Sequence, residues 1–235
     1  MPKNKHTHKK YFAIVGDHNE KIKQFFLEKG FILSGDKPDF VVSYGGDGTL
    51  LRSETLFPGV PKLFIKNTKI GKLAQKREND EILEGFIAGD YHIKKVKKIE
   101  ALVNGKHKIL GATEVTLHNS DPRFAVRYTV KIDKEQIHHE LIGDGVIVCN
   151  SLGSTGYYRS ITDSYFEVGI GLAFNNSTEQ SDHIVLKNDR HICITINRGP
   201  AILFADNQEE TIELQKDDVI ELYESHKDFN IIEIR

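Results

Sequence analysis

The sequence predicts an α/β N-terminal domain with a mostly parallel sheet, followed by a β-rich C-terminal domain. Over the first 90 residues, apolar runs alternate with segments whose apolar side chains recur at helical spacing, as in strands joined by helical crossovers. From residue 91 onward the apolar residues mostly alternate, and helix signals nearly disappear. We therefore expect domains over residues 1–90 and 91–225, with the last strand, about 225–235, able to return to the first domain.

The elements of the first domain follow in order. Tyr11–Val15 is an apolar run typical of a strand, and Glu20–Lys29 has helical spacing with Gly30 as the stop signal. Pro61–Ile65 is expected as another strand and Asn79–Ala88 as a short helix. Because crossover helices make such strands parallel, ligands are expected beyond the carboxyl ends of the strands.

The second domain is predicted almost entirely as strands. Asn104-Gly105 is a strong two-residue hairpin signal that follows the alternating run His92–Val103. Four lysines of this run are interpreted as its solvated face, namely Lys94, Lys95, Lys97 and Lys98. Further strands are expected over residues 109–117, 124–132, 146–149, 192–196, 201–205, 219–223 and 230–235.

The composition argues against nucleic-acid and membrane partners. The formal net charge is −2, with 39% hydrophobic and 28% charged residues, so no global basic field attracts either partner. No apolar stretch approaches the ~20 residues that span a bilayer. Cys149 and Cys193 each lie in an apolar run and are expected as reduced thiols. With no secretory signal at the basic N-terminus, these features predict a cytoplasmic protein.

No metal site made only of protein side chains is predicted. The histidines that occur in close pairs lack cysteine or carboxylate partners at ligand spacing, and we interpret them as surface residues. These histidines are His6, His8, His138 and His139.

The most informative segment is Asp39–Arg52, a β-branched apolar run that ends in a glycine-rich turn. The turn has the sequence Gly45-Gly46-Asp47-Gly48-Thr49. A strand, a glycine turn and a helix in that order point backbone N–H groups at a phosphate. A carboxylate would repel a phosphate, so Asp47 is interpreted as a general base or as a residue that acts through Mg²⁺. The alternative is a tight turn in which Asp47 only caps the helix.

A second dense segment, Gly143–Ser160, contains a buried strand that leads into a loop rich in glycine and hydroxyl groups, Gly153–Gly156. The hydroxyls and open backbone can hydrogen-bond a nucleotide base or a phosphate, and Tyr157 can supply a ring face or a phenol. The alternative is a structural loop whose serine and threonine cap a short helix at Tyr157.

Together, these two segments resemble the NAD kinase family. Gly45–Thr49 matches the GGDGT motif of the family. Asp144-Gly145 followed by Gly153–Tyr157 is similar to the family's DG and GSTAY elements, and Ser160 matches a serine that follows them. Phe204–Gln208 resembles a late Asp-Gly-Gln turn. Diacylglycerol and sphingosine kinases share the GGDGT motif, and the second segment favours NAD kinase.

The resemblance implies phosphoryl transfer from ATP or polyphosphate to the 2′-hydroxyl of the adenosine ribose of NAD, giving NADP, with Mg²⁺ bridging the donor phosphates. It implies that Asp47 is the general base and that the site lies between the two domains. Family members are usually dimers or tetramers, so we expect a homodimer or homotetramer. The expected nucleotide-binding positions are Gly45, Gly46, Gly48, Thr49, Leu50, Thr113, Glu114, Asp144, Ser154, Thr155, Gly156, Tyr157 and Ser160.

Two departures from the family pattern leave other functions open. Thr113 stands where the family has asparagine, and Lys72 stands where it has an aromatic residue. The lysines at 66, 69 and 72 are alternative phosphate ligands. One alternative function is a lipid kinase of the diacylglycerol or sphingosine type. The other is a catalytically weakened NAD(P)-binding protein, against which the intact Asp47 argues.

Overall fold

The structure is a computed structural model that describes residues 10–68, 71–178 and 183–235. The predictions for His6, His8 and Lys69 lie outside the described residues. The side chains of His138 and His139 also lie outside the described part.

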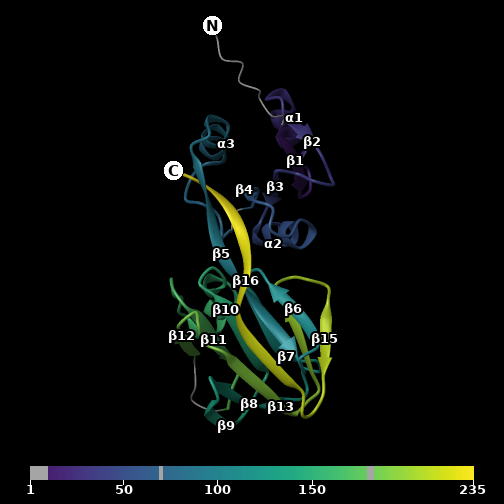
Figure 1. Cartoon of the computed structure of the whole chain (residues 1–235), viewed down its shortest axis with the longest axis vertical. Coiled ribbons are helices and arrows are strands. Elements are labelled where there is room, and N and C mark those ends of the chain that lie inside the picture. Colours follow the sequence, from purple (N-terminus) through teal and green to yellow (C-terminus); the bar gives the residue numbers. More distant parts are fainter. Residues whose placement is uncertain (1–9, 69–70, 179–182) are drawn as a thin grey trace. The chain divides into compact units, whose positions relative to one another are not determined.

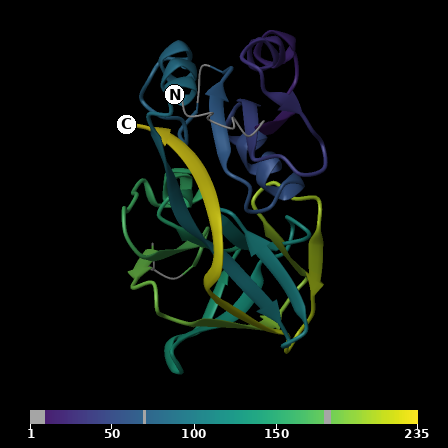
Figure 2. The same ribbon diagram turned by 45° about the horizontal axis from the view of Figure 1, so that its top comes forward.

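Two compact units make up the described chain. The first comprises the residues up to Lys95 together with Phe229–Arg235, and the second is Val96–Asp228. Two strands contribute residues to both units, β5 (Tyr91–Val103) and β16 (Val219–Ile234). These two strands are paired, and Figure 2 shows them side by side, β5 in teal and β16 in yellow.

The described residues of the first unit form a parallel sheet and three helices (Figure 1). The strand order is β2-β1-β3-β4-β16, and each of these neighbouring pairs is parallel. Helix α2 begins at Asp47, directly after Gly46, whose extended backbone forms the N-cap. The elements are β1 (Tyr11–Val15), α1 (Glu20–Glu28), β2 (Ile32–Leu33), β3 (Phe40–Gly45), α2 (Asp47–Leu56), β4 (Lys62–Lys66) and α3 (Asn79–Ala88).

Aromatic side chains fill much of the core of the first unit. Phe26 from α1, Phe40 from β3 and Phe86 from α3 are all buried. The ring centroids of Phe26 and Phe40 are 5.6 Å apart, and those of Phe40 and Phe86 are 4.7 Å apart. Such tilted aromatic pairs are favourable beyond the area they bury, so they hold α1 and α3 against the sheet.

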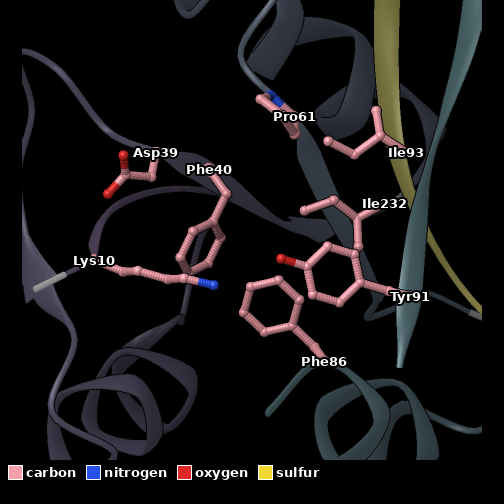
Figure 3. A pocket seen from close by; sticks show the side chains of 8 residues that line it. All are labelled: Lys10, Asp39, Phe40, Pro61, Phe86, Tyr91, Ile93 and Ile232. Atoms are coloured by element: carbon pink, nitrogen blue, oxygen red, sulfur yellow. The ribbon is translucent and has the colours of Figure 1, made fainter. Parts of the chain in front are cut away.

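A cavity of about 320 Å³ lies at the amino ends of β3 and β4. Figure 3 shows Phe40, Phe86 and Tyr91 along its wall, with the ammonium of Lys10 directed toward them. Phe40 is the first residue of β3, whereas the glycine turn begins at Gly45, the last residue of that strand. The cavity and Asp47 therefore lie at opposite edges of the sheet.

The second unit is almost entirely β. One sheet has six antiparallel strands in the order β12-β11-β10-β7-β14-β15. Facing it, β5, β6, β8, β9 and β13 pair with one another and with β16. Buried side chains such as Leu117 and Val148 from the first sheet and Tyr128 and Ile194 from the second share one core. The elements not yet defined are β6 (His107–Gly111), β7 (Glu114–Asn119), β8 (Val126–Ile132), β9 (Glu135–Gly143), β10 (Gly145–Asn150), a 3₁₀ turn (Gly153–Thr155), α4 (Tyr157–Thr162), β11 (Ile170–Asn175), β12 (His183–Leu186), β13 (Ile192–Arg198), β14 (Ala201–Ala205) and β15 (Thr211–Leu214).

A hairpin at Asn104-Gly105 is confirmed, but its loop has three residues, Asn104, Gly105 and Lys106, instead of the two expected. Asn104 and Gly105 have positive φ, 52° and 65°, and the loop joins the antiparallel pair β5 and β6. Five of the described strands were not predicted, namely β2, β9, β11, β12 and β15. Of these, β2 has only two residues, whereas β9, β12 and β15 are at sheet edges, where polar side chains are tolerated and the apolar alternation is weak. In β11, Gly171 interrupts an apolar run.

Three details of the sequence interpretation were wrong. The strand expected over 109–117 is interrupted at Ala112-Thr113, because both backbone N–H groups bond to Asp206 instead of to a neighbouring strand. The strands expected over 219–223 and 230–235 are one strand, β16, which ends at Ile234. The Lys98 side chain is 5% exposed and does not belong to a solvated face.

Helices able to span a membrane do not occur in the described part of the chain.

Candidate active site

The glycine turn at the carboxyl end of β3 is closely packed. A Cβ atom at Gly45 would lie 2.2 Å from the Oγ1 of Thr49. The neighbouring Gly16 has a φ of +127°, and a Cβ there would lie 1.9 Å from the carbonyl oxygen of Tyr44. Glycine is therefore required at both positions, since a side chain at Gly45 would displace Thr49 at the start of α2 and one at Gly16 would displace the backbone of Tyr44.

Asp47 lies in the first turn of α2, and its carboxylate is held by backbone groups. The N–H of Lys72 donates to Oδ2 at 2.8 Å, and the N–H of Leu73 donates to Oδ1 at 3.1 Å. Lys72, singled out in the sequence because of its side chain, thus contacts Asp47 through its backbone. Charge-assisted hydrogen bonds of this kind orient a carboxylate.

Buried polar contacts fix α2 on the sheet behind Asp47. The hydroxyl of Ser43 in β3 donates to the hydroxyl of Ser53 at 2.6 Å. Glu54 in α2 forms a buried ion pair with Lys62 in β4, whose ammonium also donates to the carbonyl of Val60 at 2.6 Å. The side chain of Leu50 is fully buried, so it belongs to the core.

In the second unit, the chain turns sharply between β6 and β7 around the carboxylate of Asp206. This carboxylate accepts hydrogen bonds from the N–H groups of Ala112, Thr113 and Glu114 at 2.5, 2.9 and 3.1 Å. On the other side, the amide of Asn150 donates to the carbonyl of Ala112 at 2.8 Å. The turn is thus held by Asp206, which follows β14, and by Asn150 at the end of β10. These bonds orient Glu114, the first residue of β7.

Glu114 lies in an environment that favours its neutral form. Burial, followed by the negative charge of Asp206, raises the pKa of Glu114 to about 7. Burial also raises the pKa of Asp206, despite the hydrogen bonds that its carboxylate accepts. Two neighbouring carboxyl groups with raised pKa values are typical of functional sites.

Tyr157, at the start of α4, lies within the electrostatic reach of Glu114 and Asp144. Burial raises the pKa of its phenol, and the charges of both carboxylates raise it further. The amide of Asn175 donates to the phenol oxygen at 3.1 Å. The structure therefore brings together Glu114, Asp144 and Tyr157, three of the positions expected to bind the nucleotide.

Asp144 is oriented by two asparagine amides. Asn119 donates to its Oδ1 at 3.2 Å, and Asn176 donates to its Oδ2 at 3.0 Å. The amide nitrogen of Asn175 also lies 3.4 Å from Nε2 of His118. None of these supporting residues was identified from the sequence.

The hydroxyl groups of the loop that follows β10 bond within the loop. Ser154 is fully buried, and its hydroxyl contacts the carbonyls of Ser151 and Phe166 at 2.7 and 2.9 Å. Thr155 donates to the carbonyl of Leu152 at 3.2 Å. These bonds shape the loop and fix the start of α4.

The comparisons with known proteins agree with these motifs. A family model described as the ATP-NAD kinase C-terminal domain matches residues 112–234, more than half of the chain. The chain belongs to the NAD kinase family.

Several NAD kinases are similar to this chain in sequence. The NAD kinase of Methanopyrus kandleri is 28% identical over 171 residues, which cover 69% of this chain and 62% of that protein. The NAD kinase of Saccharolobus solfataricus is 33% identical over 147 residues, 62% of this chain and 57% of that protein. The matched part of this chain thus spans about three fifths of the length of these relatives.

Solved structures of NAD kinases share the fold. An NAD kinase from Archaeoglobus fulgidus in complex with ATP has a TM-score of 0.79 at 18% identity, with 96% of this chain and 94% of that chain covered. Yeast NADH kinase complexed with NADH has a TM-score of 0.83 at 16% identity, with 98% and 85% covered.

In this member of the NAD kinase family, two of the motifs noted in the sequence form defined local structures. The GGDGT turn presents Asp47 in the first unit. The loop at Gly153–Tyr157 lies next to Glu114 in the second unit, since a Cβ at Gly156 would be 3.9 Å from the Glu114 Oε2. Among the described residues, no group of three or more His, Cys, Asp or Glu side chains is arranged to hold a metal ion.

Proposed function

We propose that this protein is an NAD kinase that transfers a phosphoryl group from ATP or polyphosphate to the 2′-hydroxyl of the adenosine ribose of NAD. The observation that carries the proposal is the Asp47 carboxylate, oriented by two backbone N–H groups at the carboxyl end of a parallel strand. In parallel α/β sheets this edge is where phosphate-bearing ligands bind.

Asp47 is proposed as the general base. It would accept the proton of the 2′-hydroxyl as the new oxygen–phosphorus bond forms and the bond to the leaving phosphate breaks. Mg²⁺ commonly binds through substrate phosphates and only one or two carboxylates, so a site with a single carboxylate fits a magnesium ion that arrives with the donor. When bound, the ion would neutralise charge on the phosphates.

The second unit is proposed to bind the dinucleotide. Glu114 is the central residue of this proposal, because a pKa of about 7 lets its carboxyl group either donate or accept a hydrogen bond near neutral pH. Asp144 and Tyr157 are held beside it by the asparagine amides described above. The other proposed contacts are Gly45, Gly46, Gly48, Thr49, Leu50 through its backbone, Thr113, Ser154 through the loop it shapes, Thr155, Gly156 and Ser160.

Two further properties belong to this proposal, a cytoplasmic location and a homodimeric or homotetrameric state. The free thiols of Cys149 and Cys193 suit a reducing compartment. Light scattering on the purified protein measures the oligomeric state directly. The lipid-kinase alternative has lost its support, because the family model that matches is that of NAD kinase.

The test is an assay for NADP formation by the purified protein. NAD and Mg²⁺ are supplied with either ATP or polyphosphate, and the Asp47→Asn variant is assayed alongside. We expect NADP from the unchanged protein and little from Asp47→Asn, with NAD affinity retained because the change is nearly isosteric.

A matched control is Asp80→Asn, which removes an exposed carboxylate from the first turn of another helix, α3. Full activity is expected for this variant. If Asp47→Asn is as active as Asp80→Asn, Asp47 is not the base. If the unchanged protein binds NAD and yet forms no NADP with either donor, the weakened NAD(P)-binding protein is the correct alternative.

A further inference from the structure

Lys66 occupies a fixed position next to the glycine turn. It is the last residue of β4 and pairs with Gly45, the last residue of β3. The side chain of Asn79 holds its backbone on both sides, since Nδ2 donates to the Lys66 carbonyl at 2.7 Å and Oδ1 accepts from the Lys66 N–H at 3.2 Å. These bonds and the pairing with Gly45 therefore fix the position of the Lys66 backbone, from which the side chain extends.

The side-chain stem of Lys66 and the carboxylate of Asp47 both lie beside the backbone of Gly71. A Cβ at Gly71 would lie 3.0 Å from Cδ of Lys66 and 3.6 Å from Oδ1 of Asp47. Lys66 is exposed. Across residues 10–68, 71–178 and 183–235, its ammonium forms no salt bridge with a carboxylate, whereas both oxygens of Asp47 accept backbone hydrogen bonds.

We propose that the ammonium of Lys66 binds a phosphate of the phosphoryl donor beside Asp47. This inference rests on the proposed kinase function and names a residue that determines donor affinity. A phosphate close to the Asp47 carboxylate is repelled by it, and a cation on the same side offsets this repulsion. An ammonium with three donors on a flexible stem follows a phosphate chain without requiring one geometry.

The structure separates Lys66 from the other lysines of this segment. Lys72 contacts Asp47 through its N–H group, and Lys69 lies outside the described residues. Lys66 thus carries a cationic side chain at the edge where β3 ends and α2 begins. The stem of Lys66 lies beside the same glycine as the Asp47 carboxylate, whereas the contact of Lys72 with Asp47 is made by its backbone.

The first test measures binding of tripolyphosphate to the full-length protein by calorimetry, without NAD. Lys66→Met keeps the length of the stem and removes the charge, and we expect the dissociation constant to rise about tenfold or more. The affinity of this variant should also depend less on salt concentration, because one cation fewer contacts the anion. Lys66→Arg keeps the charge and should restore most of the affinity.

Lys37→Met is the matched control, since Lys37 is an exposed lysine of the same unit that precedes the amino end of β3. It should bind tripolyphosphate like the unchanged protein. Unaltered affinity in Lys66→Met overturns the proposal, and so does a loss of equal size in Lys37→Met, which would mean that only total charge matters.

A second readout separates this inference from the kinase proposal. In steady-state assays, Lys66→Met should raise the KM for the phosphoryl donor and leave the KM for NAD unchanged. NADP formation by the unchanged protein decides the kinase proposal. The tripolyphosphate affinity of Lys66→Met decides the role of Lys66, whichever way the first result falls.

Discussion

The hydroxyl of Thr113 donates to Oδ1 of Asp206 at 2.7 Å, and the Thr113 N–H donates to the same oxygen at 2.9 Å. Thr113 was noted in the sequence because it lacks the amide edge of asparagine. In the structure its side chain helps to hold the turn that presents Glu114. A threonine hydroxyl is sufficient for this task, since only one donor is needed.

Removing that hydroxyl should destabilise the second unit. Thr113→Val keeps the β-branched shape and leaves a buried carboxylate with one donor fewer, at a cost of about 2 kcal/mol in the free energy of unfolding. Urea unfolding of this variant measures the cost. Thr211→Val, at an exposed position of β15, should change the midpoint very little. Equal midpoints for the two variants would show that the Asp206 contact contributes nothing.

The carboxyl group of Glu114 should make stability depend on pH. Burial and the charge of Asp206 raise its pKa from 4.5 to about 7 in the folded protein, so the folded state retains a proton that the unfolded chain has released. This contribution is complete below pH 4.5 and is lost as the pH rises through 7. Glu114→Gln lacks the titrating group.

The experiment compares urea unfolding of Glu114→Gln and the unchanged protein at several pH values. The stability of the unchanged protein relative to Glu114→Gln should fall with rising pH by on the order of 2 kcal/mol and then level off above pH 7. A difference that is constant with pH contradicts a raised pKa. Asp206→Asn should move the fall toward lower pH, because it removes the neighbouring charge.

The ion pair between Lys62 and Glu54 is buried, and breaking it from one side should be costly. Lys62→Met leaves the Glu54 carboxylate buried without this cation, which destabilises proteins by about 3–5 kcal/mol. Because Glu54 lies in α2, the helix that begins at Asp47, the variant should also lose activity. Thermal unfolding and NADP assays measure the two effects.

The double variant Lys62→Met/Glu54→Leu is the appropriate comparison for that ion pair. Replacing both charges by apolar side chains of similar volume is often nearly neutral. Most of the stability lost in Lys62→Met should therefore return. If the double variant is no more stable than the single one, the dominant contribution is the hydrogen bonds that the Lys62 ammonium donates to the carbonyls of Phe57 and Val60.

A methyl group at Gly45 should disturb the start of α2. In Gly45→Ala the new Cβ would overlap Oγ1 of Thr49, so the first turn of the helix must move. We expect tripolyphosphate binding and NADP formation to fall about tenfold or more, with circular dichroism unchanged. Gly35→Ala serves as the control, because an added Cβ there meets no atom within 4 Å. Activity equal to that control would mean that the turn tolerates a shift.

Much of the fold could be predicted from the spacing of apolar residues and from the residues typical of turns. The strand Tyr11–Val15 and the helix Asn79–Ala88 occur with their predicted bounds, and Asn104-Gly105 lies in a hairpin as expected. Edge strands such as β12 and β15 were not predicted. An edge strand pairs with a neighbour on one side only, so polar side chains are tolerated and the apolar alternation is weak. Lys98 was misassigned for a related reason, since a long aliphatic stem can be buried beside apolar neighbours.

Motifs contiguous in the sequence were identified, and the contacts that join distant parts of the chain were not. Asp206 and Glu114 are 92 positions apart, yet the backbone of one bonds to the carboxylate of the other. His118 and Asn175 come together because both strands place them opposite Gly145. Strand register creates such contacts, and register is not visible in a local pattern.

The sequence by itself determined the glycine turn with its carboxylate, the alternation of strands and helices around it, and the resemblance to NAD kinases. These features depend on local backbone geometry, which neighbouring residues control. Only the tertiary structure decided that Lys72 contacts Asp47 through its backbone, that Lys66 borders the same carboxylate, and that Asp206 holds the turn before Glu114. Those relations depend on which strands pair and which groups become buried, and both follow from packing of the whole chain.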